Sequence, residues 1–132
     1  MAHKNEETMR KADAGMAKGD PSAMFAMFAP DAVVHVGGQS KLAGTYKGID
    51  QIRESFGKFM AAVGGQPEFE THDILANDGH GVILQTLRAT RGDQRMEIPG
   101  VGIMNFTGGK VTEAWFIDVD PYAADPFYDA GP

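Results

Sequence analysis

Three segments in the first half of the chain space their apolar residues as α-helices do. The first begins at Asn5 and ends before Gly19, with Met9, Ala12 and Met16 along one stripe. The second begins at the helix-start signal Asp20-Pro21 and is apolar nearly all round until Pro30. The third, residues 50–63, repeats apolar side chains three or four positions apart and is followed by Gly64-Gly65. The pattern therefore predicts three helices, the second of them buried.

From residue 69 onward the pattern changes to the two-residue period of β-strands. A short β-branched strand is already expected at residues 32–36. Turn signals then separate four longer strands, expected at residues 69–76, 82–90, 95–106 and 111–119. These four should pair as an antiparallel meander, with a bulge at Pro99-Gly100.

Helices grouped before an antiparallel sheet predict an α+β fold. We expect a cone-shaped fold, in which three N-terminal helices pack on a strongly curved, mainly antiparallel sheet that encloses a pocket. The 132 residues suffice for a single domain, 1–132, with a core at about 5–120 and a C-terminal extension at 121–132.

Composition excludes several classes of protein. The chain has no cysteine, so disulfides, a thiol nucleophile and thiolate metal ligands are excluded. A formal net charge of −6 argues against nucleic acid or an anionic membrane as partner. No apolar run approaches the ~20 residues of a membrane helix, and the first residues lack the apolar core of a signal peptide. We expect a cytoplasmic protein.

Several short motifs, in order and at matching spacing, resemble the SnoaL-like branch of the nuclear transport factor 2 superfamily. The resemblance covers roughly residues 12–128, and its motifs are Gly19-Asp20, Phe28, Asp31-Ala32, Gly44–Gly48 and Gly109-Lys110-Val111. It implies a conical fold with a pocket for a small hydrophobic or polycyclic molecule.

The catalytic sets of characterised relatives are missing at the equivalent positions. The tyrosine, base and second donor of ketosteroid isomerase correspond to Ala12, Val36 and Gly102, which transfer no proton. The positions that activate water in limonene epoxide hydrolase correspond to Val34, Val36, Thr86, Arg88 and Phe116. The histidine and aspartate of SnoaL-type cyclases correspond to Gly102 and Phe116. The resemblance therefore predicts a pocket without those sets.

Three polar residues remain as catalytic candidates. Arg88 is in register with pocket-facing positions of relatives and can orient an anion, with Asp118 or another acid as its partner. Asp118 alternates onto the same face as Phe116, as an acid or base at the rim. His35 is a candidate proton shuttle, although strict alternation turns it toward the opposite face.

The expected ligand-binding residues are those that the resemblance places around the pocket. They are Val34, Val36, Tyr46, Phe56, Met60, Thr86, Gly102, Met104 and Phe116. We find no metal-ligand spacing and no phosphate-binding loop, so we expect neither a metal nor a cofactor.

Trp115 alternates away from Phe116, onto the outer face of the sheet beside Ile117 and Val119. An apolar outer face predicts a homodimer. The leading function is an isomerase, cyclase or hydrolase-type enzyme, for example one resembling an epoxide hydrolase, acting on a mainly hydrophobic molecule. Two alternatives stay open: a non-catalytic small-ligand-binding protein and a protein-interaction module.

Overall fold

The structure is a computed structural model that describes residues 3–132. Met1 and Ala2, the start of the segment in which we found no signal peptide, lie outside the described residues. The helices are α1 (Lys4–Ala17), α2 (Ser22–Ala26), α3 (Ile49–Ala62) and α4 (Pro121–Ala130). The strands are β1 (Phe28–Val36), β2 (Gly44–Lys47), β3 (Glu68–Ala76), β4 (His80–Arg91), β5 (Gln94–Thr107) and β6 (Lys110–Asp118).

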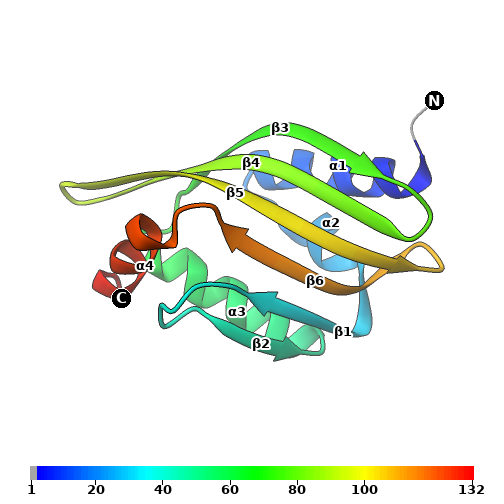
Figure 1. The fold of residues 1–132 in the computed structure, drawn as a ribbon, viewed down its shortest axis with the longest axis horizontal. Helices are drawn as coiled ribbons and strands as arrows, with labels where there is room; N and C mark the ends of the chain where they lie inside the picture. Colours follow the sequence, from blue (N-terminus) through cyan, green and yellow to red (C-terminus); the bar gives the residue numbers. More distant parts are fainter. Residues whose placement is uncertain (1–2) are drawn as a thin grey trace.

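The strands form one six-stranded mixed sheet in the order β2-β1-β6-β5-β4-β3. β1 runs parallel to β6, and every other neighbouring pair is antiparallel. The predicted meander of four strands is β3 to β6. Figure 1 shows α1, α2 and α3 behind the sheet and α4 beside the end of β6. The predicted α+β class is confirmed, with the N-terminal helices on one face of the sheet, here called the inner face.

The first helix follows the predicted pattern, with a different cap. His3 accepts a hydrogen bond from the backbone N–H of Asn5 through Nδ1, at 3.0 Å, so the cap lies two residues earlier than expected. The Asn5 side chain instead donates to the carbonyl of Asn77 at 2.9 Å, which ties α1 to the turn between β3 and β4. Met9 and Ala12 are buried against the sheet.

The second helix is shorter than predicted, since it ends at Ala26 and β1 begins at Phe28. Pro30 disfavours helical geometry at the residue before it, and Phe28 pairs with Val111 of β6. The apolar run therefore continues into a buried strand instead of completing a helix.

The bulge predicted at Pro99-Gly100 is wrong. Pairing across β4 and β5 continues without a shift through Thr86–Pro99 and Gln85–Gly100. The carbonyl of Pro99 accepts a hydrogen bond from the N–H of Val119 at 2.8 Å, just beyond the end of β6. The N–H and C=O of a strand residue point toward the same neighbouring strand, so Pro99, which has no N–H, lacks a donor only on the side of β6 and costs no bond to β4. The register shifts lie elsewhere: between Phe28 and Val33, between Thr71 and Asp73, and between Asn105 and Phe106.

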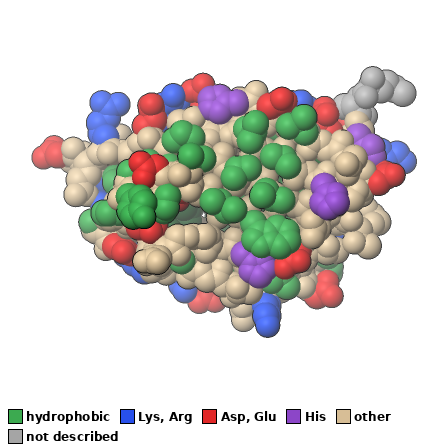
Figure 2. Space-filling view, viewed as in Figure 1, with side chains coloured by type: hydrophobic (Ala, Val, Ile, Leu, Met, Phe, Trp, Pro, Cys, Tyr) green, Lys and Arg blue, Asp and Glu red, His purple; other side chains and the backbone are tan. Residues whose placement is uncertain are grey.

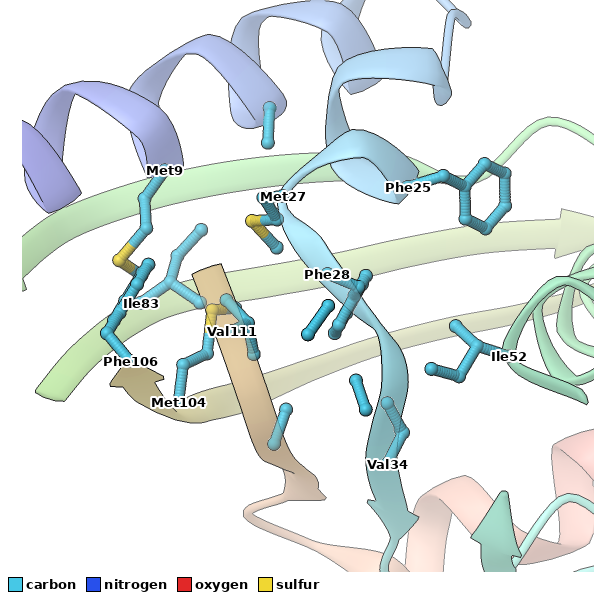
Figure 3. Close-up of a cluster of buried hydrophobic side chains, with 14 of the residues drawn as sticks. Met9, Phe25, Met27, Phe28, Val34, Ile52, Ile83, Met104, Phe106 and Val111 are labelled. Atoms are coloured by element: carbon cyan, nitrogen blue, oxygen red, sulfur yellow. The ribbon is translucent and has the colours of Figure 1, made fainter. Parts of the chain in front are cut away.

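Two apolar clusters pack between the helices and the inner face. Figure 3 shows the larger one, where Met9 of α1, Met27 and Phe28 meet Ile83 and Met104 of the sheet. The second cluster joins α3 and α4 to the C-terminal half of β4 and the N-terminal half of β5, and includes Val63, Leu87 and Phe127. Within residues 3–132 no buried side-chain nitrogen or oxygen lacks a hydrogen-bond partner. Nor is any helix in this range long and apolar enough to cross a membrane.

Candidate ligand pocket

A cavity of about 230 Å³ lies between the inner face of the sheet and the helices. Liquid water occupies ~30 Å³ per molecule, so the cavity has room for a small organic molecule rather than for a single water. Its walls come from all four helices, the loop before β2, and strands β1 and β3 to β6. The lining residues are Met9, Ala12, Asp13, Met16, Met24, Met27, Phe28, Val34, Val36, Leu42, Ile52, Ser55, Phe56, Phe59, Phe69, Ile83, Gln85, Leu87, Gly100, Val101, Met104, Phe116, Ile117, Asp118 and Tyr128.

Helical and strand periods explain how separate segments supply this lining. On α1, Met9, Ala12 and Met16 recur every three or four residues and so share one face. On β4, Ile83, Gln85 and Leu87 alternate with residues of the opposite face. The lining is therefore mainly thioether, aliphatic and aromatic, with a few polar side chains set into it.

The polar pair Asp118 and Tyr128 forms one end of the cavity. Asp118 is the last residue of β6, and the Tyr128 hydroxyl of α4 donates to its Oδ2 at 3.0 Å. Burial raises the pKa of Asp118; the Tyr128 hydrogen bond opposes this rise, and the charge of Asp125 adds to it. Burial, followed by the negative charge of Asp118, raises the pKa of Tyr128, so this hydroxyl remains a donor at neutral pH.

Carboxylates hold α4 in place beside this pair. Asp120 caps the helix by accepting from the N–H of Ala123 at 3.2 Å, and Pro121 occupies the first turn. Asp125 accepts from the backbone N–H of Gln39 at 2.9 Å, and Asp129 accepts from the N–H of Lys41 at 2.7 Å. These bonds join α4 to the loop before β2. That loop brings Leu42 into the wall and so helps to position Tyr128.

Three further polar side chains line the cavity. Asp13 of α1 accepts a hydrogen bond from the hydroxyl of Thr71 at 2.6 Å. Ser55 and Gln85 reach the cavity from α3 and β4. Among the described residues, the lining contains no lysine, arginine or histidine.

The structure brings six of the expected site residues together around this cavity. They are Val34, Val36, Phe56, Met104, Phe116 and Asp118. Gly102 is buried directly beneath the wall, where an added Cβ would lie 2.8 Å from Cγ2 of Ile83. This glycine leaves room for the ring of Phe116 and the side chain of Ile83.

Arg88 occupies the outer face of the sheet, which differs from the expected inner position. Its neighbours Leu87 and Ala89 are buried inside, so strict alternation turns Arg88 outward. The guanidinium pairs there with Glu97 of β5 and Glu70 of β3, each at 2.6 Å. Its partners are thus acids of the outer face rather than Asp118.

Thr86 lies on the same outer face as Arg88 and shares a 2.7 Å hydrogen bond with His72. It also differs from its expected position in the pocket. Tyr46 and Met60 do not line the cavity either: Tyr46 donates from its hydroxyl to the carbonyl of Leu42 at 2.7 Å, and Met60 is half-buried on α3.

His35 also lies on the outer face, the side that alternation favoured. Its ring stacks on Trp115 with centroids 5.3 Å apart, and its Nε2 donates to Glu113 at 2.6 Å. Thr45 of β2 lies 3.0 Å from the Nδ1 atom. The imidazole is therefore separated from the cavity by the sheet.

Sequence reasoning missed Tyr128, Asp13, Ser55 and Gln85 as lining residues. Tyr128 was detectable, because Asp120-Pro121 repeats the helix-start signal seen earlier and Ala124, Phe127 and Tyr128 follow at helical spacing. The placement of Asp13 follows only from the angle at which α1 crosses the sheet, and no local pattern encodes this angle.

Residues 9–114 of the chain match the SnoaL-like domain family. The uncharacterised protein Rv0034 of Mycobacterium tuberculosis is 29% identical over 123 residues, which are 92% of this chain and 94% of that protein. Bal32a, from a soil-derived mobile gene cassette, has a similar structure, with a TM-score of 0.87, 29% identity and coverage of 96% and 98% of the two chains.

TerC, whose crystal structure was determined with polyporic acid, superposes with a TM-score of 0.83 at 18% identity, covering 96% of this chain and 99% of TerC. At that identity the likeness concerns the fold alone. The family match spans most of the sequence and agrees with the helices, sheet and cavity described above. The chain belongs to the SnoaL-like domain family, within the fold group of nuclear transport factor 2.

Proposed function

We propose that this protein is an enzyme that binds a small, mainly apolar molecule in the cavity and moves a proton with Asp118. In this proposal, the inner sheet face and the N-terminal helices form the wall of a conical binding site. One observation carries it: a carboxylate with a raised pKa lies in a largely apolar wall, held by the Tyr128 hydroxyl.

Asp118 suits the role of a general base. Removing it partly from water raises its proton affinity, and a base with a pKa nearer to neutrality accepts a substrate proton more readily. Tyr128 donates to Oδ2 and fixes the carboxylate, so Oδ1 is the oxygen left for substrate. The reaction class that follows is proton abstraction next to a carbonyl, as in an isomerisation or a cyclisation, or activation of a water molecule for hydrolysis.

TerC supports the small-molecule part of the proposal, because polyporic acid was crystallised with that protein of the same fold. A non-catalytic binding protein is the second candidate function. It is favoured by the distance of His35 and Arg88 from the cavity, since neither residue can serve Asp118 as a proton partner.

Hydrogen–deuterium exchange into 2-tetralone separates these two functions. This ketone is apolar, has two rings and carries acidic α-protons, so a base in the cavity should accelerate their exchange in D2O, measured by NMR. We expect Asp118→Asn to lower the rate about 100-fold, within the range usual for loss of a general base. Asp93→Asn, in the exposed turn between β4 and β5, removes an equal charge and should leave the rate unchanged.

Binding of the ketone is measured in parallel by calorimetry. Binding without exchange above the buffer rate would assign the protein to the non-catalytic class. Absence of binding for this and other two-ring probes would remove the small-molecule proposal itself.

A further inference from the structure

The charge of the cavity lining is one-sided. Its titratable residues are Asp13, Asp118 and Tyr128, two acids and a phenol, and within residues 3–132 no lysine, arginine or histidine lines the cavity. The negative charge of Asp125 on α4 also contributes to raising the pKa of Asp118. A ligand therefore meets carboxylate oxygens, the neutral polar side chains of Ser55 and Gln85, and apolar groups. It meets no guanidinium, ammonium or imidazolium that would neutralise an anion.

Three cations of the surrounding elements already have other partners. Arg53 of α3 lies over the Phe25 ring, 4.5 Å from its centroid. Arg91, at the end of β4, donates to the carbonyls of Ala62 and Phe127. Lys41 donates to the carbonyl of Gly131. These contacts hold the positive charges away from the interior, so the electrostatic character of the cavity is that of Asp13 and Asp118.

Because the cavity walls are mainly apolar, the excess of negative charge in the lining should affect which ligands bind. Charges interact more strongly where water is excluded, so an anion beside Asp118 would force that carboxyl to take up a proton or would lose binding energy by repulsion. A protonated amine would instead donate to the free Oδ1 while the Tyr128 hydroxyl occupies Oδ2. The rings of Phe116 and Tyr128 line the same region and favour a cation over their faces.

We propose that the ligand of this cavity is an aromatic or alicyclic amine that places its protonated nitrogen against Asp118, and that the site rejects carboxylates of the same shape. This inference rests on the proposed function, because it assigns a substrate class to the same cavity. Asp118 then selects the charge of the ligand through Oδ1, the oxygen that the Tyr128 hydrogen bond leaves for the substrate.

Three probes with one naphthalene body test the charge selection: 1-naphthylmethylamine, 1-naphthalenemethanol and 1-naphthoate. Dissociation constants are measured by calorimetry at pH 7.5 on the full chain. We expect the amine to bind at least tenfold more tightly than the carboxylate, with the neutral alcohol between them. Asp118→Asn should reduce the ratio to about threefold or less, since it removes the charge but keeps the shape.

Asp93→Asn is the matched control, because it changes the net charge equally at an exposed turn residue that does not line the cavity. Its ratio should equal that of the unmodified chain, which separates a local effect of Asp118 from attraction by the overall negative charge. Circular dichroism confirms that each variant is folded.

The possible outcomes separate a failure of the amine assignment from a failure of the proposed function. If the carboxylate binds as tightly as the amine, or if Asp118→Asn keeps the full ratio, the amine assignment is overturned while a small-molecule site remains. If none of the three probes binds, the cavity is not a small-molecule site, and both the amine assignment and the proposed function fall.

Discussion

At the scale of single residues, three positions around the cavity are notable for what they cannot do. Ala12 and Val36 line it, and Gly102 lies buried beneath the contact of Ile83 and Phe116. In relatives that isomerise ketosteroids, the equivalent positions carry the base and the two donors. Here they carry hydrogen or small alkyl groups, which shape the space and transfer no proton.

We therefore expect no ketosteroid isomerase activity. A β,γ-unsaturated ketosteroid incubated with the protein should form conjugated enone no faster than in buffer, as followed by ultraviolet absorbance. Ketosteroid isomerase itself, assayed in parallel, confirms that the assay responds. A rate clearly above the buffer rate would contradict the expectation.

Individual residues also show where sequence reasoning succeeds. The inner position of Asp118 was predictable, because it continues the alternation of Ala114 and Phe116 along an unbroken strand. Arg88 was assigned to the other face by transferring a register from relatives. Its own neighbours, the apolar Leu87 and Ala89, carried the better signal, since a one-residue slip moves every side chain across the sheet.

At the scale of elements, α4 links the second apolar cluster to the polar end of the cavity. Phe127 and Ala124 pack into that cluster, and Arg91 lies over the Phe127 ring, 4.2 Å from its centroid. On the same helix, Tyr128 reaches the cavity, while Tyr122 is 92% exposed. The C-terminal segment expected as an extension is thus part of the packed structure.

Phe127→Ala should lower the free energy of unfolding by about 3–5 kcal/mol, the usual loss for removing a buried phenylalanine. Tyr122→Ala, on the exposed side of the same helix, should change it by less than about 0.5 kcal/mol. Urea unfolding followed by circular dichroism measures both values. Equal effects of the two substitutions would show that α4 does not contribute its buried face to stability.

Elements with several independent signals were the ones that the sequence predicted well. The third helix and the four strands of the meander combine a clear period with turn residues at both ends, and the structure has them within a few positions. β2 was missed, because Gly44–Lys47 is a strand only through its pairing with β1. Such short edge strands depend on a distant partner, and local patterns do not encode that partner.

At the scale of the whole molecule, the two faces of the sheet have different environments. Helices cover the inner face, whereas Figure 2 shows apolar side chains gathered on the outer face over β4, β5 and β6. This outer apolar patch consists of Val82, Leu84, Val101, Ile103, Trp115 and Ile117, of which Val101 and Ile117 also border the cavity. The ion pairs of Arg88 lie at one border of the patch, and the pair of His35 with Glu113 lies at another.

We expect two copies of the chain to associate through this outer apolar patch, because an apolar patch rimmed by polar groups is typical of a protein interface. A two-fold dimer should bury on the order of 1,200–2,000 Å² in total. Sedimentation at micromolar concentration should give a species near twice the 14.2 kDa of the chain.

Leu84→Glu should raise the dissociation constant of the dimer at least tenfold, because Leu84 is 40% exposed in the single chain and its replacement would bury a carboxylate between the copies. Tyr122→Glu adds the same charge at a highly exposed site outside the patch and should leave association unchanged. A single species of about 14 kDa for the unmodified chain would contradict the dimer and leave the outer apolar patch a solvent-facing surface.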